Sequence, residues 1–409
     1  MEKTISVTTQ RIIDEEEKYS AHNYHPLPVV LSKGEGVFVW DVEGKKYFDF
    51  LSAYSAVNQG HSHPKIVAAL VDQAQTLALT SRAFHNDVFY KFSKYITSYF
   101  GFDKVLPMNT GAEAVETALK LSRKWGYEKK GIPANKARII FCQNNFHGRT
   151  ITIISASNDP DATKNFGPYT PGISSIPYND VAALAKELED PNVAAFVVEP
   201  IQGEAGVYVP ELGFLKKSYD LCKSKNVLFV ADEVQTGIAR TGKLIACDHE
   251  GVKPDILILG KAVSGGVYPV SCVLANNDVM DVIHPGEHGS TFGGNPIACR
   301  VAMAALEVVR EEKLAERSEY LGEILRKELR AIKSDMISLV RGKGLLNAIV
   351  IKPKNGKEAW DVCLKLRDNG LLAKPTHGDI IRFAPPLIIT EEQLMECVDI
   401  IRKSIMEME

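Results

Sequence analysis

Two neighbouring apolar segments indicate the fold class: Val227-Leu-Phe-Val-Ala-Asp232-Glu-Val-Gln235-Thr-Gly and Asp255-Ile-Leu-Ile-Leu-Gly-Lys261. Neither alternates apolar with polar residues, so both are typical of strands buried on both faces. Similar runs occur at 104–108, 137–142 and 193–198, with helix-like stretches between them. The sequence therefore predicts an α/β fold with a largely parallel sheet, in which ligands bind beyond the carboxyl ends of the strands.

The segments on either side of this sheet predict a second, smaller unit. They comprise a helix over 9–18, strands at 36–41 and 44–49, one long helix from Ile297 to Arg330, strands at 345–351 and 380–383, and a final helix from Glu391. A separate helix is predicted from His63 to Leu77. We expect three parts: residues 1–55 joining the small domain, residues 56–295 forming the large domain, and residues 296–409 forming the small domain.

The composition of the chain excludes several classes of protein. The chain has 409 residues, a net charge of −3, 45% hydrophobic and 24% charged residues, which matches an ordinary globular protein. No run of about 18 apolar residues predicts a membrane span, and no basic cluster predicts nucleic-acid binding. Seven widely spaced cysteines indicate reduced thiols, and the acidic run at 14–17 opposes a mitochondrial presequence, so we expect a cytoplasmic protein. A mature organellar form whose leader has been removed stays open.

Asp232 and Lys261 each end a predicted strand, so both are expected at one edge of the sheet. A carboxylate opposite a ring nitrogen and a lysine that forms a Schiff base are the two groups that pyridoxal phosphate chemistry requires. Taken alone, a lysine after a strand is more often on the surface, and an aspartate there is more often a helix cap. The helix start at Asn109-Thr-Gly-Ala112 offers unpaired N–H groups that suit a phosphate, and the three features together favour the cofactor site.

Two further turns carry polar or aromatic side chains. Phe146-His-Gly-Arg149 combines a ring that can stack on a flat cofactor with an arginine that can bind a carboxylate. Gly289-Ser-Thr-Phe-Gly-Gly-Asn-Pro296 carries two hydroxyls just before a helix. By itself, the second turn is equally consistent with a plain connection between domains.

The whole set of motifs resembles the class III, fold-type I pyridoxal-phosphate aminotransferases, and the resemblance covers nearly the whole chain. The motifs are Asn109-Thr-Gly-Ala-Glu-Ala, Phe146-His-Gly-Arg, Glu199-Pro-Ile-Gln-Gly-Glu204, Asp232-Glu-Val-Gln-Thr-Gly, Gly260-Lys261-Ala and Gly289-Ser-Thr-Phe-Gly-Gly-Asn-Pro. The resemblance implies a large domain with a mainly parallel seven-stranded sheet, a smaller α+β domain, and a homodimer with a shared site.

The resemblance also implies the residues that bind the cofactor. Lys261 would bind it covalently and move the substrate proton, and Asp232 would pair with the ring nitrogen. The remaining cofactor contacts would be Thr110, Gly111, Ala112, Phe146, His147, Glu199, Val234 and Gln235, with Ser290 and Thr291 reaching the phosphate from the partner subunit.

Further motifs are similar to those of family members that act on ornithine, which implies the substrates. They are Ala21-His-Asn-Tyr-His-Pro-Leu-Pro, Ser52-Ala-Tyr-Ser-Ala-Val-Asn-Gln-Gly-His and Arg341-Gly-Lys-Gly-Leu-Leu. The expected reaction converts L-ornithine and 2-oxoglutarate to L-glutamate 5-semialdehyde and L-glutamate in a ping-pong cycle. Substrate contacts would be Tyr24, Tyr54, Arg149, Glu204 and Arg382, with Glu204 masking Arg382 while ornithine is bound.

Several alternatives stay open. Acetylornithine, 4-aminobutyrate or another ω-amine would suit the same fold, as would an aminomutase acting on a semialdehyde, and a catalytically silent cofactor-binding protein would be compatible with it. Metal binding is not expected, because His61-Ser-His63 lies where a turn leads into a helix.

Overall fold

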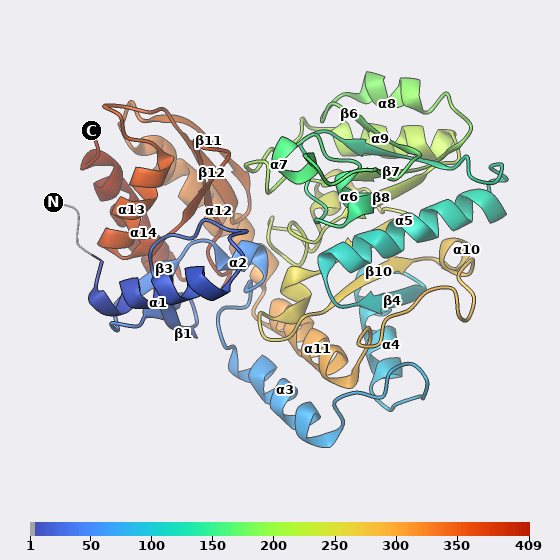
Figure 1. Cartoon of the computed structure of the whole chain (residues 1–409), viewed down its shortest axis with the longest axis horizontal. Helices are drawn as coiled ribbons and strands as arrows, with labels where there is room; N and C mark the ends of the chain where they lie inside the picture. Colours follow the sequence, from blue (N-terminus) through green and yellow to red (C-terminus); the bar gives the residue numbers. More distant parts are fainter. Residues whose placement is uncertain (1–4) are drawn as a thin grey trace.

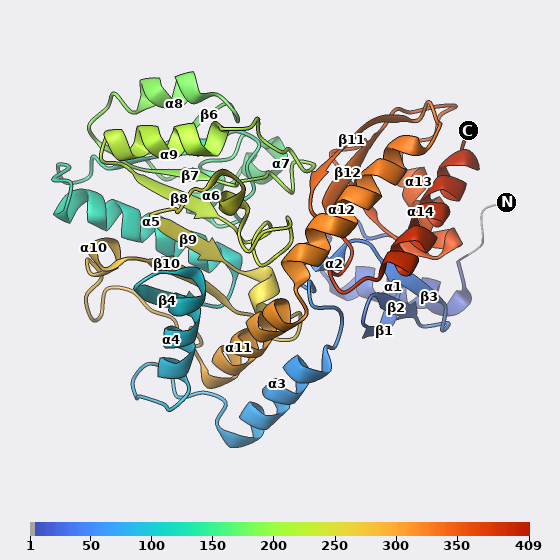
Figure 2. The same ribbon diagram turned by 180° about the vertical axis from the view of Figure 1, so that it is seen from behind.

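The computed structural model describes residues 5–409 and has two lobes. Figure 1 shows a larger lobe built around a central sheet and a smaller lobe that contains both ends of the chain. Figure 2, seen from behind, shows the two helices α11 (Pro296–Glu311) and α12 (Leu314–Ala331) running one after the other from the larger lobe to the smaller.

The larger lobe contains a seven-stranded, mainly parallel sheet, as predicted. Its strand order is β4 (Lys104–Met108), β10 (Ser271–Ala275), β9 (Ile256–Leu259), β8 (Leu228–Asp232), β7 (Val193–Val198), β5 (Arg138–Cys142) and β6 (Ile173–Ile176). Only β10 runs antiparallel to its neighbours, β4 and β9. The chain therefore brings the carboxyl ends of β7, β8 and β9 to one edge.

Helices cover both faces of this sheet. Successive side chains on a strand point to opposite faces, so Val230 and Ile258 join one apolar cluster and Phe229 and Leu257 the other. The first face is covered by α5 (Gly111–Glu128), α6 (Ile151–Ile154) and α10 (Asn277–Met280), and the second by α4 (Phe89–Phe100), α8 (Val181–Glu187), α9 (Phe214–Ser224) and α11. Burial on both faces explains why these strands are apolar throughout.

The smaller lobe combines two sheets. An antiparallel sheet has the order β11 (Ile337–Lys343), β12 (Leu346–Ile351), β15 (Ile380–Phe383) and β14 (Lys374–Thr376). The other has the order β1 (Leu31–Glu35), β2 (Phe38–Asp41), β3 (Lys46–Asp49) and β13 (Leu371–Leu372), and β13 pairs in parallel with β3. This pairing of distant segments supports the predicted association of the N-terminal part with the small domain. The domain boundaries themselves stay a prediction.

The remaining elements are helices. They are α1 (Val7–Tyr19), α2 (Ser52–Ser55), α3 (Pro64–Thr76), α7 (Pro160–Thr163), α13 (Ala359–Asn369), α14 (Glu391–Met406) and the short 3₁₀ helices η1 (Ala246–Glu250) and η2 (Lys261–Ser264). α12 packs on β11 and against α14, and α13 also packs against α14.

The single long helix predicted from Ile297 to Arg330 is wrong. The chain forms α11 and α12, separated at Glu312 and Lys313, and Lys313 has a left-handed backbone with φ of 53°. A left-handed residue ends the hydrogen-bond series of a helix. No glycine or proline marks this break in the sequence, so the periodic pattern appeared continuous.

Three further observations concern the cysteines, the two histidines His61 and His63, and the length of the helices. All seven cysteines are buried and free. His61 contacts Asp49 and His63 contacts Glu312, and residues 5–409 contain no group of three potential metal ligands. Within the same range no helix is both long and apolar enough to cross a bilayer.

Candidate active site

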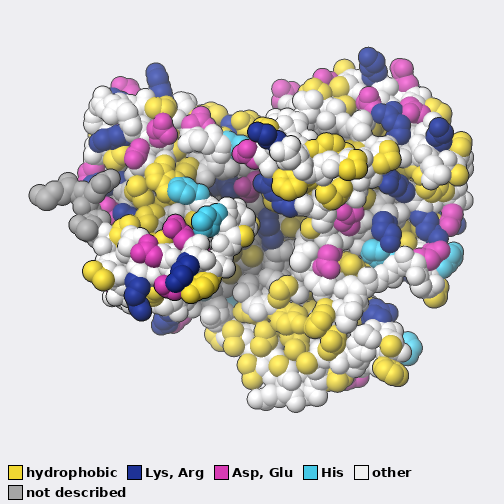
Figure 3. All heavy atoms as spheres, viewed as in Figure 1, with side chains coloured by type: hydrophobic (Ala, Val, Ile, Leu, Met, Phe, Trp, Pro, Cys, Tyr) yellow, Lys and Arg dark blue, Asp and Glu magenta, His cyan; other side chains and the backbone are white. Residues whose placement is uncertain are grey.

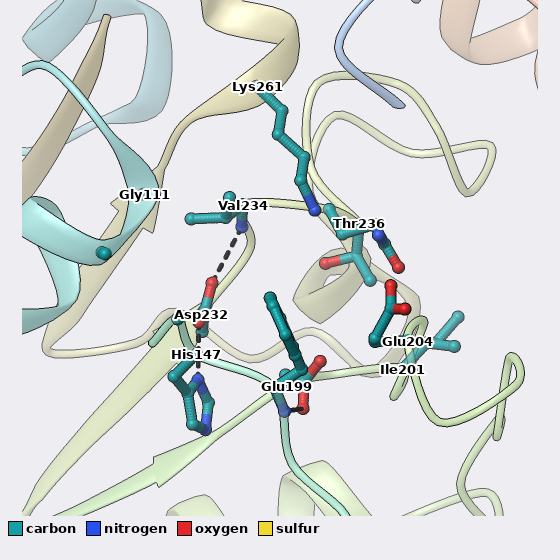
Figure 4. Close-up of a pocket in the computed structure, with 13 residues that line it drawn as sticks. Gly111, His147, Glu199, Ile201, Glu204, Asp232, Val234, Thr236 and Lys261 are labelled. Carbon is teal, nitrogen blue, oxygen red and sulfur yellow. Dashed lines mark hydrogen bonds and ion pairs between the residues drawn. The ribbon is translucent and has the colours of Figure 1, made fainter. Parts of the chain in front are cut away.

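A cavity of about 190 Å³ lies at the edge where β7, β8 and β9 end. Figure 4 shows side chains from these strand ends converging on it, with Gly111 of α5 beside them. The lining residues are Gly111, Ala112, Phe146, His147, Gly148, Glu199, Ile201, Glu204, Asp232, Val234, Gln235, Thr236 and Lys261. The structure therefore gathers most of the predicted cofactor residues around one space.

Lys261 enters the cavity directly after β9. Its backbone has φ of 44°, an uncommon conformation for a residue with a side chain and one that often marks functional sites. In Figure 4 the side chain extends toward Thr236 and Glu204. Burial lowers the pKa of Lys261 to about 8, against the opposing effect of nearby carboxylates led by Glu204. A larger share of its amine is therefore unprotonated near neutral pH, which nucleophilic attack on a carbonyl requires.

Asp232 ends β8 and is held in place by two hydrogen bonds. Its Oδ1 accepts from the Val234 N–H at 3.0 Å, and its Oδ2 lies 2.6 Å from Nδ1 of His147. Burial opposes a charge on His147, yet its bond to Asp232 and the Asp232 and Glu199 carboxylates leave the pKa of His147 raised. Asp232 is only 5% exposed, so a charged Asp232 carboxylate would meet a cationic ligand with little screening by water.

Phe146 and Val234 both line the cavity. The Phe146 N–H donates to Oε2 of Glu199 at 3.0 Å, which fixes the turn that carries the aromatic ring. Burial raises the pKa of Glu199 to about 8, with Asp232 adding to the rise and His147 opposing it. Near neutral pH this carboxyl therefore has a raised tendency to hold a proton.

The first turn of α5 forms another wall. Thr110 and Glu113 form a capping box, in which the Thr110 hydroxyl accepts from the Glu113 N–H and the Glu113 carboxylate accepts from the Thr110 N–H. This leaves the N–H groups of Gly111 and Ala112 without partners inside the helix. A Cβ at Gly111 would lie 3.0 Å from the Val234 side chain. Glycine therefore allows the first turn of α5 to lie this close to Val234.

These groups fit pyridoxal phosphate. The N-terminus of α5 suits its phosphate, the Asp232 carboxylate its ring nitrogen, and Lys261 its aldehyde. Gln235 lies beside them, and its buried side-chain oxygen has no hydrogen-bond partner within the described part of the chain. A buried amide with an unpaired atom is expected where a polar ligand completes the site.

On the substrate side, Glu204 and Arg382 form an ion pair. Nη1 of Arg382 lies 2.7 Å from Oε2 of Glu204, and Nη2 lies 3.3 Å from Oε1. Arg382 is 4% exposed, and its guanidinium lies 5.0 Å from the centre of the Tyr54 ring. The arginine is thus buried and paired with a carboxylate.

An unusual backbone places Tyr54 there. Although α2 has helical hydrogen bonding, Ser52, Ala53, Tyr54 and Ser55 all have positive φ, between 49° and 75° for three of them and 46° for Ala53. Each left-handed residue costs about 1–2 kcal/mol, so surrounding contacts must hold this turn. Burial, followed by Glu204 and Tyr24, raises the pKa of Tyr54 against the effect of Arg382.

The other predicted contacts lie outside the cavity lining. Tyr24 is 75% exposed, and the Arg149 side chain is 57% exposed with its guanidinium 5.3 Å from the centre of the Phe146 ring. The Ser290 hydroxyl accepts from the Asn109 side chain at 2.8 Å, and Thr291 is exposed. Ser290 and Thr291 do not line the cavity of their own chain.

Sequence reasoning missed three lining residues, Gly148, Ile201 and Thr236. All three stand inside motifs that were recognised, so their position next to predicted residues was the available signal. The bond between His147 and Asp232 had no such signal, because it joins the turn after β5 to the last residue of β8.

Comparisons with known proteins agree with this geometry. The family described as aminotransferase class-III matches residues 19–405. The relative named ornithine aminotransferase, mitochondrial, from Drosophila melanogaster is 68% identical over 96% of this chain and 91% of its own length.

Two solved structures are similar over nearly their whole length. The ornithine aminotransferase from Toxoplasma gondii ME49 has 51% identity and a TM-score of 0.96, covering 99% of this chain and 96% of its own. The acetylornithine aminotransferase from Elizabethkingia anophelis has 65% identity and a TM-score of 0.90, covering 98% of this chain and 99% of its own. With a matched family, full-length relatives and a cavity of the expected composition, the chain belongs to the class-III aminotransferases, which depend on pyridoxal phosphate.

Proposed function

We propose that the protein transfers the δ-amino group of L-ornithine to 2-oxoglutarate, giving L-glutamate 5-semialdehyde and L-glutamate. The observation that carries the proposal is the buried ion pair between Glu204 and Arg382 beside Lys261. An enzyme with these substrates must accept a terminal amine in one half-reaction and a carboxylate at the same place in the other. Arg382 meets both demands if it is paired with Glu204 in the first half-reaction and binds the substrate carboxylate in the second. The relatives named ornithine aminotransferase support the same reaction.

The chemistry is divided between the cofactor and the chain. When bound, pyridoxal phosphate supplies an aldehyde that accepts the amino group and a ring that withdraws electrons. The buried Asp232 carboxylate keeps a proton on the ring nitrogen. Lys261, whose side chain lines the cavity, would hold the cofactor and would accept and return the proton of the substrate carbon.

In the ornithine half-reaction, we propose that Tyr24 and Arg149 bind the α-amino and α-carboxylate groups, and that Tyr54 shapes the space beside them. Glu204 keeps Arg382 neutralised, so no free cation repels the incoming amine. In the second half-reaction the carboxylate of 2-oxoglutarate replaces Glu204 on Arg382. A buried arginine without a partner is costly, so the exchange of one carboxylate for another avoids that cost.

We propose that the protein is a homodimer in which Ser290 and Thr291 bind the phosphate in the partner's site. Ser290 and Thr291 lie outside the cavity of their own chain. Figure 3 shows hydrophobic side chains gathered over α3 and α11, and exposed apolar residues in this region and the following loop include Val71, Leu77, Leu79 and Phe84. A contiguous apolar surface of this kind favours an interface.

The cellular compartment stays a prediction. The sequence favours the cytoplasm, whereas the name of the Drosophila melanogaster relative includes the word mitochondrial. Fractionation of cells that express the tagged full-length protein decides between the two.

The main rival substrate is N-acetylornithine, favoured by the name of the relative from Elizabethkingia anophelis. Acetylation removes the positive charge from the α-amino group, so the two substrates differ in charge at the end distant from the cofactor. The discriminating experiment mixes the holoenzyme separately with L-ornithine, N-acetylornithine and 4-aminobutyrate, and follows loss of the cofactor's visible absorption band.

We expect rapid loss of the band with L-ornithine and recovery after 2-oxoglutarate is added. N-Acetylornithine and 4-aminobutyrate should react at least about tenfold more slowly, because each lacks the charged α-amino group of L-ornithine. Faster reaction with N-acetylornithine would move the assignment to that substrate and leave the fold and cofactor unchanged.

Glu204→Ala should make the enzyme accept α-amines more readily. Without Glu204, the α-carboxylate of L-glutamate no longer has to displace a charged partner from Arg382. We expect the rate ratio of L-glutamate to L-ornithine half-reactions to rise about tenfold or more, since hydrogen bonds between charged groups contribute about 1.5–3 kcal/mol. Stopped-flow absorbance measures both rates, with Glu211→Ala, an exposed carboxylate on the same connection, as the control. An unchanged preference between the two amino groups of ornithine would refute the masking role.

A further inference from the structure

Glu204 lies on a closed turn, residues 202–208, which we call the Glu204 turn. Gln202 and Tyr208 exchange both of their backbone hydrogen bonds, at 3.1 and 3.0 Å. Inside the turn, the Val207 N–H donates to the Gly203 carbonyl at 3.2 Å, and Val207 adopts φ of 60°, which is rare for a β-branched residue. The turn is thus internally tied, and outside contacts must set its position.

Two residues of the smaller lobe supply such contacts. The Thr376 hydroxyl on β14 donates to the backbone carbonyl of Glu204 itself, at 3.0 Å. Arg341 on β11 donates from Nε to the Gly206 carbonyl at 2.9 Å, and its guanidinium lies 3.9 Å from the centre of the Tyr208 ring. Thr376 thus contacts the residue that masks Arg382, and Arg341 contacts the far arm of the turn.

The opposite side of the turn is attached to the larger lobe. The Gln202 side chain donates to the carbonyl of Gln143, just after β5, at 2.8 Å. The Glu204 turn therefore bridges the two lobes, with its tip held by the small sheet.

The same small sheet carries Arg382. Arg382 lies on β15, and its neighbour β14 pairs Lys374 with Arg382 and Thr376 with Ile380. One sheet therefore holds the arginine and also the hydroxyl that fixes the backbone of its carboxylate partner. This arrangement keeps Glu204 in the two-point geometry with Arg382, at 2.7 and 3.3 Å.

We propose that Thr376 and Arg341 are positioning residues that set how strongly Glu204 masks Arg382. They thereby tune how readily the site exchanges an ω-amine for a five-carbon dicarboxylate. This inference rests on the proposed function, because it requires that Glu204 leaves Arg382 when a dicarboxylate binds. Neither residue touches the substrate in this scheme, and both act through the Glu204 turn.

The test uses glutarate, a five-carbon dicarboxylate without an amino group, as a binding probe for the holoenzyme in calorimetry. Thr376→Val removes the hydroxyl at nearly constant volume, and Thr376→Ser retains it. Losing one hydrogen bond to the turn should lower the Kd of glutarate about three- to tenfold in Thr376→Val, and leave it within about twofold in Thr376→Ser. Arg341→Lys, which loses the flat stack on Tyr208, should shift the Kd in the same direction and serves if Thr376→Val folds poorly.

A double-mutant cycle with Glu204→Ala separates the possible failures. If the inference holds, Glu204→Ala tightens glutarate binding and Thr376→Val adds nothing further in that background. If Glu204→Ala tightens binding while Thr376→Val and Arg341→Lys do not, the positioning role is overturned. An equal effect of Thr376→Val with and without Glu204 would also overturn it. Unchanged binding in Glu204→Ala would instead contradict the masking of Arg382 in the proposed function.

Discussion

Replacing Lys261 with alanine lowers turnover by about 10²–10⁴-fold and removes the absorption band of the lysine-bound cofactor. Lys261 is the lysine that lines the cavity, and its strained backbone at the end of β9 aims the amine at the centre of the site. Its lowered pKa, about 8, increases the share of amine that is free to react. Absorbance spectra before and after addition of pyridoxal phosphate, followed by an assay with L-ornithine and 2-oxoglutarate, measure both effects.

Lys217→Ala is the matched control, because Lys217 lies on the exposed side of α9 in the same lobe. It should retain the band and the activity. Partial recovery of Lys261→Ala turnover by a small primary amine in solution would identify the missing group as the amine itself. Turnover of Lys261→Ala at more than about one hundredth of the original rate would contradict the role given to this residue.

The second large effect is expected from Asp232→Asn. Asparagine keeps the shape of the side chain but removes the charge that holds a proton on the ring nitrogen. Removing one preorganised electrostatic partner from a site excluded from water costs about 10²–10³-fold in rate. Asp232 is 5% exposed, so water cannot replace it. We expect kcat to fall by this factor while KM for L-ornithine changes little, because Asp232 does not touch the distant end of the substrate.

Asp255→Asn tests whether the loss depends on position. Asp255 directly precedes β9 and lies at the amino ends of the strands, opposite to Asp232. There it accepts from the Phe229 N–H at 2.9 Å and pairs with Lys223. Its loss should affect stability more than kcat. Equal reductions of kcat in the two variants would show that Asp232 acts only through the fold of the sheet.

The residues that sequence reasoning placed most securely are those attached to strand ends. Asp232 and Lys261 follow apolar runs whose burial on both faces implies a parallel sheet, and such a sheet brings its carboxyl ends together. The family resemblance added the seven strands, which the structure confirms. β6 was missed because Ser174 and Ser175 interrupt its apolar character, whereas β10 is fully buried and was simply not recognised.

The substrate side depended on contacts that no local pattern encodes. Periodicity gives no sign that four residues around Tyr54 form a left-handed turn, because none of them is glycine. The link from Thr376 to Glu204 joins segments that are far apart in the chain. The sequence did not indicate the break between α11 and α12 for a similar reason. Lys313 adopts a left-handed backbone conformation, which a lysine in the sequence does not predict. Tertiary contacts decide such features, and they become apparent only in the folded chain.

The central claim is that the δ-amino group of L-ornithine, and not its α-amino group, is transferred to 2-oxoglutarate. The most direct measurement supplies the holoenzyme with ornithine labelled with ¹⁵N at the δ position and records the label in the products by mass spectrometry. The glutamate formed from 2-oxoglutarate should carry the label, and the semialdehyde formed from ornithine should not. Unlabelled glutamate, with the label retained on the ornithine-derived product, would contradict the claim.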